Sequence, residues 1–316
     1  MKRFIGILVV LSSLALISFL GIASSQGQSE LANQHKIIHR LRGDKDEDKN
    51  KDAHPPEAGK AKPQRGNGIT YHGGPLLGVV GGNPVTAYYI WYGNWSGNTA
   101  VTILTDFIQN IAPSPYFNIN TTYYNGSNVH VSNSVTFGGS TNTNTSVYGT
   151  SLTDAEIQSI VRDALVSGRL PYDTSGIYFV LTSADVTASS GFCTQYCGWH
   201  TYGTINGFNI KYSFVGNPDR CPSACEAQTT GPNGNAGADG MASIIAHELE
   251  EAVTDPNLNA WYDNRGAENA DKCAWTFGSL STAGNGSKYN MTLGSRNYLI
   301  QQNWVNASGG FCAKSY

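Results

Sequence analysis

The sequence predicts a fold of the α/β or α+β class in one secreted domain, with a central mixed sheet and flanking helices. Two patterns carry this prediction. The β-branched and aromatic runs at residues 85–91 and 176–182 have the composition of buried strands. Residues 100–111, 153–167 and 239–254 place apolar side chains at helical spacing. Strands and helices that alternate in this way over about 250 residues indicate a single layered domain.

The first 25 residues have the order of a secretory signal peptide. Met1-Lys2-Arg3 is a short positive region, residues 4–22 carry no charge, and Ala23-Ser24-Ser25 offers small residues for cleavage. The apolar run is also long enough for an uncleaved membrane anchor, which needs about 20 apolar residues. The small residues favour the signal peptide, and therefore a mature protein without a stable membrane span.

Residues 26–67 are expected to form a disordered, charged linker or pro-segment. Residues 42–52 are almost all charged, and few large apolar side chains accompany them, so the segment cannot bury enough surface to offset its chain entropy. His35 and His39 lie in this segment and are expected to be solvated. The globular domain is predicted to cover residues 68–316.

Charge excludes one class of partner. The net charge of −3, with 14% charged residues, provides no basic stripe for nucleic acid. Few charges together with many aromatic and turn residues are typical of an extracellular fold that is rich in strands and loops.

All six cysteines lie between residues 193 and 312, which in a secreted chain implies a disulfide framework. The two C-x3-C pairs are also compatible with a zinc knot, but the oxidising environment outside the cell favours disulfides. We expect the first four cysteines to cross-link one another. We also expect Cys273 to pair with Cys312, which would staple the C-terminal part of the chain.

The first half of the domain begins with the strand at residues 85–91. The following helix ends where Ala112-Pro113-Ser114-Pro115 interrupts it. Residues 123–137 alternate around Asn and Ser, which suggests edge strands or a hairpin. Thr153 and Glu156 form a capping box for the next helix, which Gly168 and Pro171 end.

The helix predicted at residues 239–254 carries the most informative motif. Asp239 is placed to cap it, and it ends before Pro256. His247 and Glu251 are four residues apart and project from one face, so they can bind one metal ion together. Glu248 is adjacent and can act as general base toward a water that the metal activates.

This helix resembles the H-E-x-x-H helix of zinc metallopeptidases, and locally that of the gluzincins. In gluzincins a downstream helix supplies a third, carboxylate ligand, and the resemblance implies Glu268 or Asp271 for that role. Glu251 stands where the second histidine is expected. One divalent metal is predicted, zinc first, with manganese or calcium as alternatives because the ligands include two carboxylates. The alternative is a solvated helix face with no metal.

Two further histidines are candidate ligands. His200 follows Cys197-Gly198-Trp199, where the cysteine loops could hold it near the helix, as a ligand or a transition-state stabiliser. His72 lies in a glycine-rich turn that leaves its direction open. Each is more often a hydrogen-bonded structural residue.

The ordered set of motifs over residues 68–316 resembles the EXORDIUM, or phosphate-induced, family. The resemblance implies an extracellular or cell-wall protein, linked in plants to growth promotion and to phosphate or brassinosteroid response, whose biochemical activity is poorly defined. The residues that carry it are Tyr71-His-Gly-Gly-Pro-Leu-Leu, Tyr89-Ile-Trp-Tyr-Gly, Phe192-Cys-Thr-Gln-Tyr-Cys-Gly-Trp-His, Cys221-Pro-Ser-Ala-Cys, Asp239-Gly-Met, the His247 helix, and Glu268 to Cys273.

Two functional hypotheses follow from these motifs. The first is a metal-dependent hydrolase, similar to a metallopeptidase, acting on an extracellular peptide or cell-wall substrate. In it His247, Glu251, Glu268 and Asp271 are the candidate metal ligands and Glu248 is the catalytic base. The second is a non-catalytic extracellular or cell-wall protein with a structural or vestigial metal site.

Overall fold

The computed structural model describes residues 37–42 and 68–316. The predicted signal peptide and most of the predicted linker or pro-segment lie outside these residues. All of the described residues belong to one structural unit.

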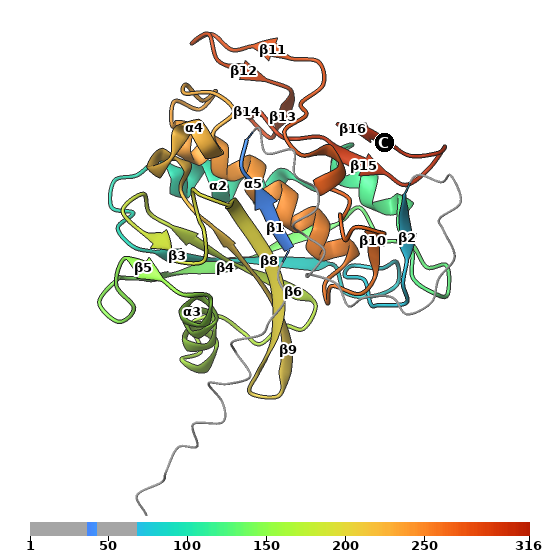
Figure 1. The fold of residues 1–316 in the computed structure, drawn as a ribbon, viewed down its shortest axis with the longest axis horizontal. Helices are drawn as coiled ribbons and strands as arrows, with labels where there is room; N and C mark the ends of the chain where they lie inside the picture. The colour runs from blue at the N-terminus through green and yellow to red at the C-terminus, as the bar shows by residue number, and fades with distance from the viewer. Residues whose placement is uncertain (1–36, 43–67) are drawn as a thin grey trace, which may run out of the picture. The chain divides into compact units, whose positions relative to one another are not determined.

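A six-stranded mixed sheet forms the centre of this unit (Figure 1). Its strands are β1 (Ile37–Arg40), β3 (Val85–Tyr92), β4 (Val135–Thr143), β6 (Gly176–Thr182), β8 (Tyr196–Ile205) and β9 (Phe208–Val215). They lie in the order β1-β8-β9-β6-β3-β4. Strands β9, β6, β3 and β4 are parallel to one another, whereas β8 is antiparallel to β9 and to β1. The predicted central mixed sheet is confirmed.

Helices cover both faces of this sheet. Figure 1 shows α2 and α5 on one side and α3 on the other. The apolar stripes read from the sequence are buried in both α2 and α3, and the capping box of Thr153 and Glu156 is present. The helices and 3-10 turns are α2 (Ala100–Asn110), α3 (Asp154–Val166), α4 (Pro222–Cys225), α5 (Ala236–Thr254), η3 (Phe117–Thr122), η4 (Pro218–Arg220) and η5 (Asp271–Cys273).

The motif-bearing helix α5 begins earlier than predicted. Its N-cap is Asn235, whose side chain accepts a hydrogen bond from the Ala238 amide at 3.0 Å. The prediction that Asp239 caps the helix is therefore wrong, and Asp239 instead accepts from the Asn233 amide at 2.9 Å. The helix ends at Thr254 as expected. Nearly all of α5 is buried, so its acidic residues do not form a solvated face.

Short two-stranded sheets complete the domain. Residues 123–137, predicted as edge strands or a hairpin, contain an isolated bridge between Tyr124 and His130 and the start of edge strand β4. The pairs are β2 (Ile69–Tyr71) with β10 (Trp261–Asp263), β5 (Ser151–Leu152) with β7 (Thr187–Ala188), β11 (Ser281–Thr282) with β12 (Lys288–Tyr289), β13 (Met291–Leu293) with β14 (Arg296–Tyr298), and β15 (Asn303–Val305) with β16 (Phe311–Ala313).

The disulfide pattern agrees with the prediction. The first four cysteines cross-link one another, and the third bridge joins η5 to β16. The bridges are Cys193–Cys221, Cys197–Cys225 and Cys273–Cys312.

Removing the Cys273–Cys312 bridge is expected to destabilise the fold. The bridge joins residues 39 positions apart. Closing a loop of that size lowers the conformational entropy of the unfolded chain, which raises its free energy by about 4 kcal/mol. Replacing both cysteines with alanine should lower the free energy of unfolding by about that amount in chemical denaturation. An unchanged denaturation midpoint would contradict this expectation.

Strand β1 comes from the segment that was predicted to be disordered. His39 has a fully buried side chain, so the expectation that it is solvated is wrong. The physical reason is that β1 pairs with the edge of β8, which removes backbone and imidazole from water together. None of the helices in the described part of the chain combines the length and apolar content that crossing a bilayer requires.

Candidate metal centre

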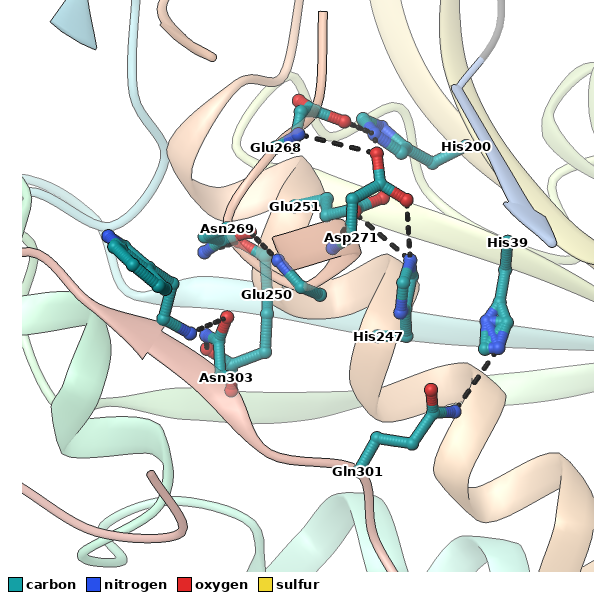
Figure 2. Close-up of polar contacts among 12 residues, drawn as sticks. His39, His200, His247, Glu250, Glu251, Glu268, Asn269, Asp271, Gln301 and Asn303 are labelled. Atoms are coloured by element: carbon teal, nitrogen blue, oxygen red, sulfur yellow. Dashed lines mark hydrogen bonds and ion pairs between the residues drawn. The ribbon is translucent and has the colours of Figure 1, made fainter. Parts of the chain in front are cut away.

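Seven titratable side chains from four parts of the fold meet between α5 and β8. Helix α5 contributes three of them, β8 and β1 one each, and the segment from Glu268 into η5 contributes two, as Figure 2 shows for all but Glu248. Six of the seven residues are at most 1% exposed to solvent, and the side chain of the seventh, Asp271, is 10% exposed. We call this set the acidic–histidine cluster: His39, His200, His247, Glu248, Glu251, Glu268 and Asp271.

His247, Glu251 and Asp271 form one corner of the cluster. The His247 Nε2 atom lies 3.0 Å from Glu251 Oε1 and 3.6 Å from Asp271 Oδ1. The Asp271 amide donates to Glu251 Oε1 at 3.1 Å, which ties the loop to α5. Tetrahedral ligands about 2.1 Å from a zinc ion are separated by about 3.4 Å. The spacing of the three donor atoms therefore suits one metal ion.

His200 and Glu268 form the second corner. Their side chains are in contact, with His200 Nε2 2.8 Å from Glu268 Oε2. His200 Nε2 also lies 3.6 Å from Glu251 Oε2. Glu251 therefore faces His247 with one oxygen and His200 with the other (Figure 2). Of the predicted ligands, Glu268 is the one that reaches the centre through His200 rather than by contact with His247.

Glu248 occupies a position that both β8 and α5 restrict. A Cβ atom at Gly198 of β8 would lie 2.9 Å from Glu248 Oε1 and 2.6 Å from a methyl group of Ile244. Glycine at this point of the strand therefore makes room for the carboxylate. Neither oxygen of Glu248 accepts a hydrogen bond from the described residues.

Burial controls the protonation of the acidic residues. It raises the pKa of Glu248 and of Glu268 well above the usual range. Burial also raises the pKa of Glu251 to about 7, although His247 opposes this shift. Burial would lower the pKa of His247, but Glu251, Asp271 and Glu248 outweigh it and raise that pKa well above its usual value.

The cluster fits a divalent cation. Four of its buried oxygens, two of Glu248 and one each of Glu251 and Glu268, have no hydrogen-bond partner among the described residues. An orphaned buried acceptor costs about 1–3 kcal/mol, and more for a charged group. Buried charges in proteins are normally paired or bound to metals. Imidazole and carboxylate groups are ordinary ligands of zinc and of manganese.

His39 is the functional candidate that sequence reasoning missed. Its ring lies edge-on to that of His247, with centroids 4.1 Å apart, and 5.2 Å from the ring of Trp275. The side chain of Gln301 contacts it at 3.1 Å between the two Nε2 atoms (Figure 2). The only signal for this placement was the Ile37-Ile38 pair, an apolar step in an otherwise charged segment.

Glu250 and His72 lie apart from the cluster. Glu250 is fully buried on α5, but it turns toward Asn303, whose Nδ2 donates to Glu250 Oε2 at 2.7 Å. His72 stacks on Tyr262 at 3.7 Å and contacts that residue's carbonyl oxygen. These two residues provide matched controls for substitutions in the cluster.

A pH effect is expected from Glu226, at the end of α4. Burial, with a contribution from Asp219, raises the pKa of this carboxyl to about 7. The folded state therefore retains a proton that the unfolded chain loses between about pH 4.5 and 7, so stability falls as the pH rises through this range. Glu226→Gln should raise the free energy of unfolding near pH 7.5 by about 1 kcal/mol, after discounting for solvent screening. Denaturation near pH 4 is the internal control, where equal stabilities are expected; equal stabilities near pH 7.5 would contradict the assignment.

Comparison with known proteins bears on the whole domain. A family model described as the phosphate-induced protein 1 conserved region matches residues 69–310. The protein EXORDIUM-like 5 of Arabidopsis thaliana is 33% identical, with 75% of each chain covered. EXORDIUM-like 3 from the same plant is 32% identical, over 75% of this chain and 80% of the relative. PHOSPHATE-INDUCED 1 of Nicotiana tabacum is 26% identical, over 61% and 67% of the two chains.

No solved structure gives a significant match to the chain. The family assignment therefore rests on the sequence matches. Both the family match and the two Arabidopsis relatives cover most of the folded domain, and the family match includes α5 and the loop before η5. The resemblance noted in the sequence is confirmed: the chain belongs to the EXORDIUM-like family defined by the phosphate-induced protein 1 conserved region.

Proposed function

We propose that the acidic–histidine cluster binds one divalent metal ion, zinc first, and that the centre hydrolyses peptide bonds outside the cell. The observation that supports this proposal is the set of buried carboxylate oxygens without partners in the described residues, gathered around His200 and His247. A cation would satisfy several of those oxygens together.

Each residue has a distinct role in this proposal. His247, Glu251 and Asp271 would hold the metal, which supplies Lewis acidity toward water and the substrate carbonyl. Glu268 contacts His200 and would fix the direction of that ring. Glu248 would take the proton from the attacking water and pass it to the leaving group.

A second candidate function rests on a different observation. Six of the seven cluster residues are at most 1% exposed, which is the arrangement of a structural metal rather than of a site open to substrate. In this alternative the chain is a non-catalytic extracellular or cell-wall protein. Secretion is proposed in both cases, and the three disulfides and the family membership support it.

The pH dependence of metal binding tests the site. Below about pH 7 Glu251 holds a proton that the metal must displace, so affinity should rise with pH through that region. Displacing the Glu251 proton corresponds to a rise of about tenfold in affinity per pH unit below pH 7, and the proton that His247 must also lose makes the total rise steeper. Zinc titrations of the full chain at several pH values measure this slope. Glu250→Gln should leave it unchanged. A pH-independent affinity, or no binding, would contradict the proposed centre.

A further inference from the structure

We propose that the outer edge of β8 is a binding site for an extended peptide, and that β1 occupies this site in the present structure. The inference rests on the proposed function, because it places the peptide substrate against the metal centre. It assigns the substrate a strand conformation and a register. It also gives the buried cluster a route of access.

Strand β8 would be an edge strand without β1. Its other side is paired along its length with β9. An uncovered edge presents unpaired backbone N–H and C=O groups, which another extended chain can bind by adding a strand. In this structure β1 makes that addition in antiparallel register, with Ile38 opposite Trp199 and His39 opposite Gly198.

The register brings the added strand to the proposed base. Gly198, opposite His39, is the residue whose missing Cβ leaves room for Glu248. The ring of His39 reaches His247 at 4.1 Å between centroids, and a donor atom of His39 lies within 4.8 Å of donors from His247 and Glu248. Any peptide that replaces β1 in this register places its backbone beside Glu248 at the residue opposite Gly198.

The two walls of the site carry different chemistry. On the β8 side the partners are backbone groups, which an extended peptide satisfies in series and a sugar chain does not. Beyond His39 lies a pocket whose lining includes Ile244, Trp275 and Gln301. Trp275 and Gln301 are also contacts of His39. This pocket therefore adjoins the side chain of the residue opposite Gly198, and the backbone groups of β8 make a peptide the expected occupant.

Strand β1 lies outside the region that the family model covers. The family match begins at residue 69, whereas β1 lies at residues 37–40. The covering strand thus lies outside the conserved region that the family model describes. A segment of the same chain that fills a substrate edge and contacts a proposed metal ligand acts as an internal competitor. Access to the cluster then depends on the release of β1.

Hydrogen–deuterium exchange of the full chain tests this inference. The substitutions Ile38→Pro and His39→Pro are designed to weaken the pairing of β1 with β8. In an antiparallel pair, hydrogen-bonded and non-hydrogen-bonded residues alternate along the strand, so one of the two prolines removes a backbone N–H that bonds to β8. Lys51→Pro is the control outside the paired strand. Amides 196–200 of β8 should exchange at least tenfold faster in a β1 variant than in the control. A synthetic peptide with the sequence of residues 34–43 should restore their protection, and the same peptide with proline in place of His39 should restore less.

The outcomes separate this inference from the metal proposal. Exchange is measured with zinc and after chelation, alongside metal content. Protection of β8 by the peptide in a protein that binds no zinc would support the peptide site and reject the metal centre. Zinc binding with no protection by the peptide in either proline variant would overturn the peptide site alone. Protection by a cell-wall oligosaccharide and not by the peptide would also overturn it.

In the unsubstituted chain, excess peptide should accelerate exchange of amides 37–40, and unchanged exchange there would count against displacement of β1.

Discussion

Replacing Glu248 with glutamine is expected to reduce peptide hydrolysis by roughly 100- to 10,000-fold while the metal content stays the same. Glutamine keeps the shape of the side chain beside Gly198 but cannot take a proton from water. The rate is measured by peptide cleavage with the full chain and with the Ile38→Pro variant, in which β1 is weakened.

Glu250→Gln is the matched control for this experiment. It removes a fully buried carboxylate from the same helix, yet the amide oxygen of the new side chain can still accept from Asn303. Cleavage by this variant should remain within about threefold of the unsubstituted rate, because general-base effects are confined to the base itself. Equal rates for Glu248→Gln and the unsubstituted chain would reject Glu248 as the base. Loss of activity in both variants would assign the effect to packing of α5.

Replacing His247 with alanine is expected to abolish stabilisation by zinc. A ligand present at about 1,000 times its dissociation constant stabilises the folded state by about 4 kcal/mol. In a domain of this size that is a rise of roughly 10 °C in the melting temperature. The rise should disappear in His247→Ala, because His247 contacts both Glu251 and Asp271 in the corner proposed to hold the metal.

His72→Ala serves as the control for that measurement. It makes the same change at a histidine that stacks on Tyr262, away from the cluster. Its melting temperature can fall, but the rise on adding zinc should match that of the unsubstituted chain. Differential scanning calorimetry with and without zinc gives both values. A zinc-dependent rise that survives in His247→Ala would contradict the assignment of this ligand.

Local patterns predicted the secondary structure well. The stripe of Ile103, Leu104, Phe107 and Ile108 is buried as the helical period requires, and the capping box at Thr153 marks a helix start that needs no tertiary information. The start of α5 was misplaced because Asp239 and Asn235 are both good caps, and the turn before the apolar run contains only small residues.

The composition of the site was only partly predictable. His247, Glu248 and Glu251 share one helix, so their spacing along the chain determines their spacing in space. His200 and His39 arrive through strand pairing, and the contact of β1 with β8 joins residues about 160 positions apart in the sequence. Nothing local in a charged segment specifies such a partner. The burial of His39 could therefore be seen only in the three-dimensional structure.

The central claim is that the acidic–histidine cluster is a metal centre, and anomalous X-ray diffraction tests it most directly. Crystals of the full chain grown with zinc would be measured on both sides of the zinc absorption edge. One strong anomalous peak is expected about 2.0–2.2 Å from His247 Nε2 and from a carboxylate oxygen of Glu251. An ordered cluster with no peak in that position, at full zinc saturation, would contradict it.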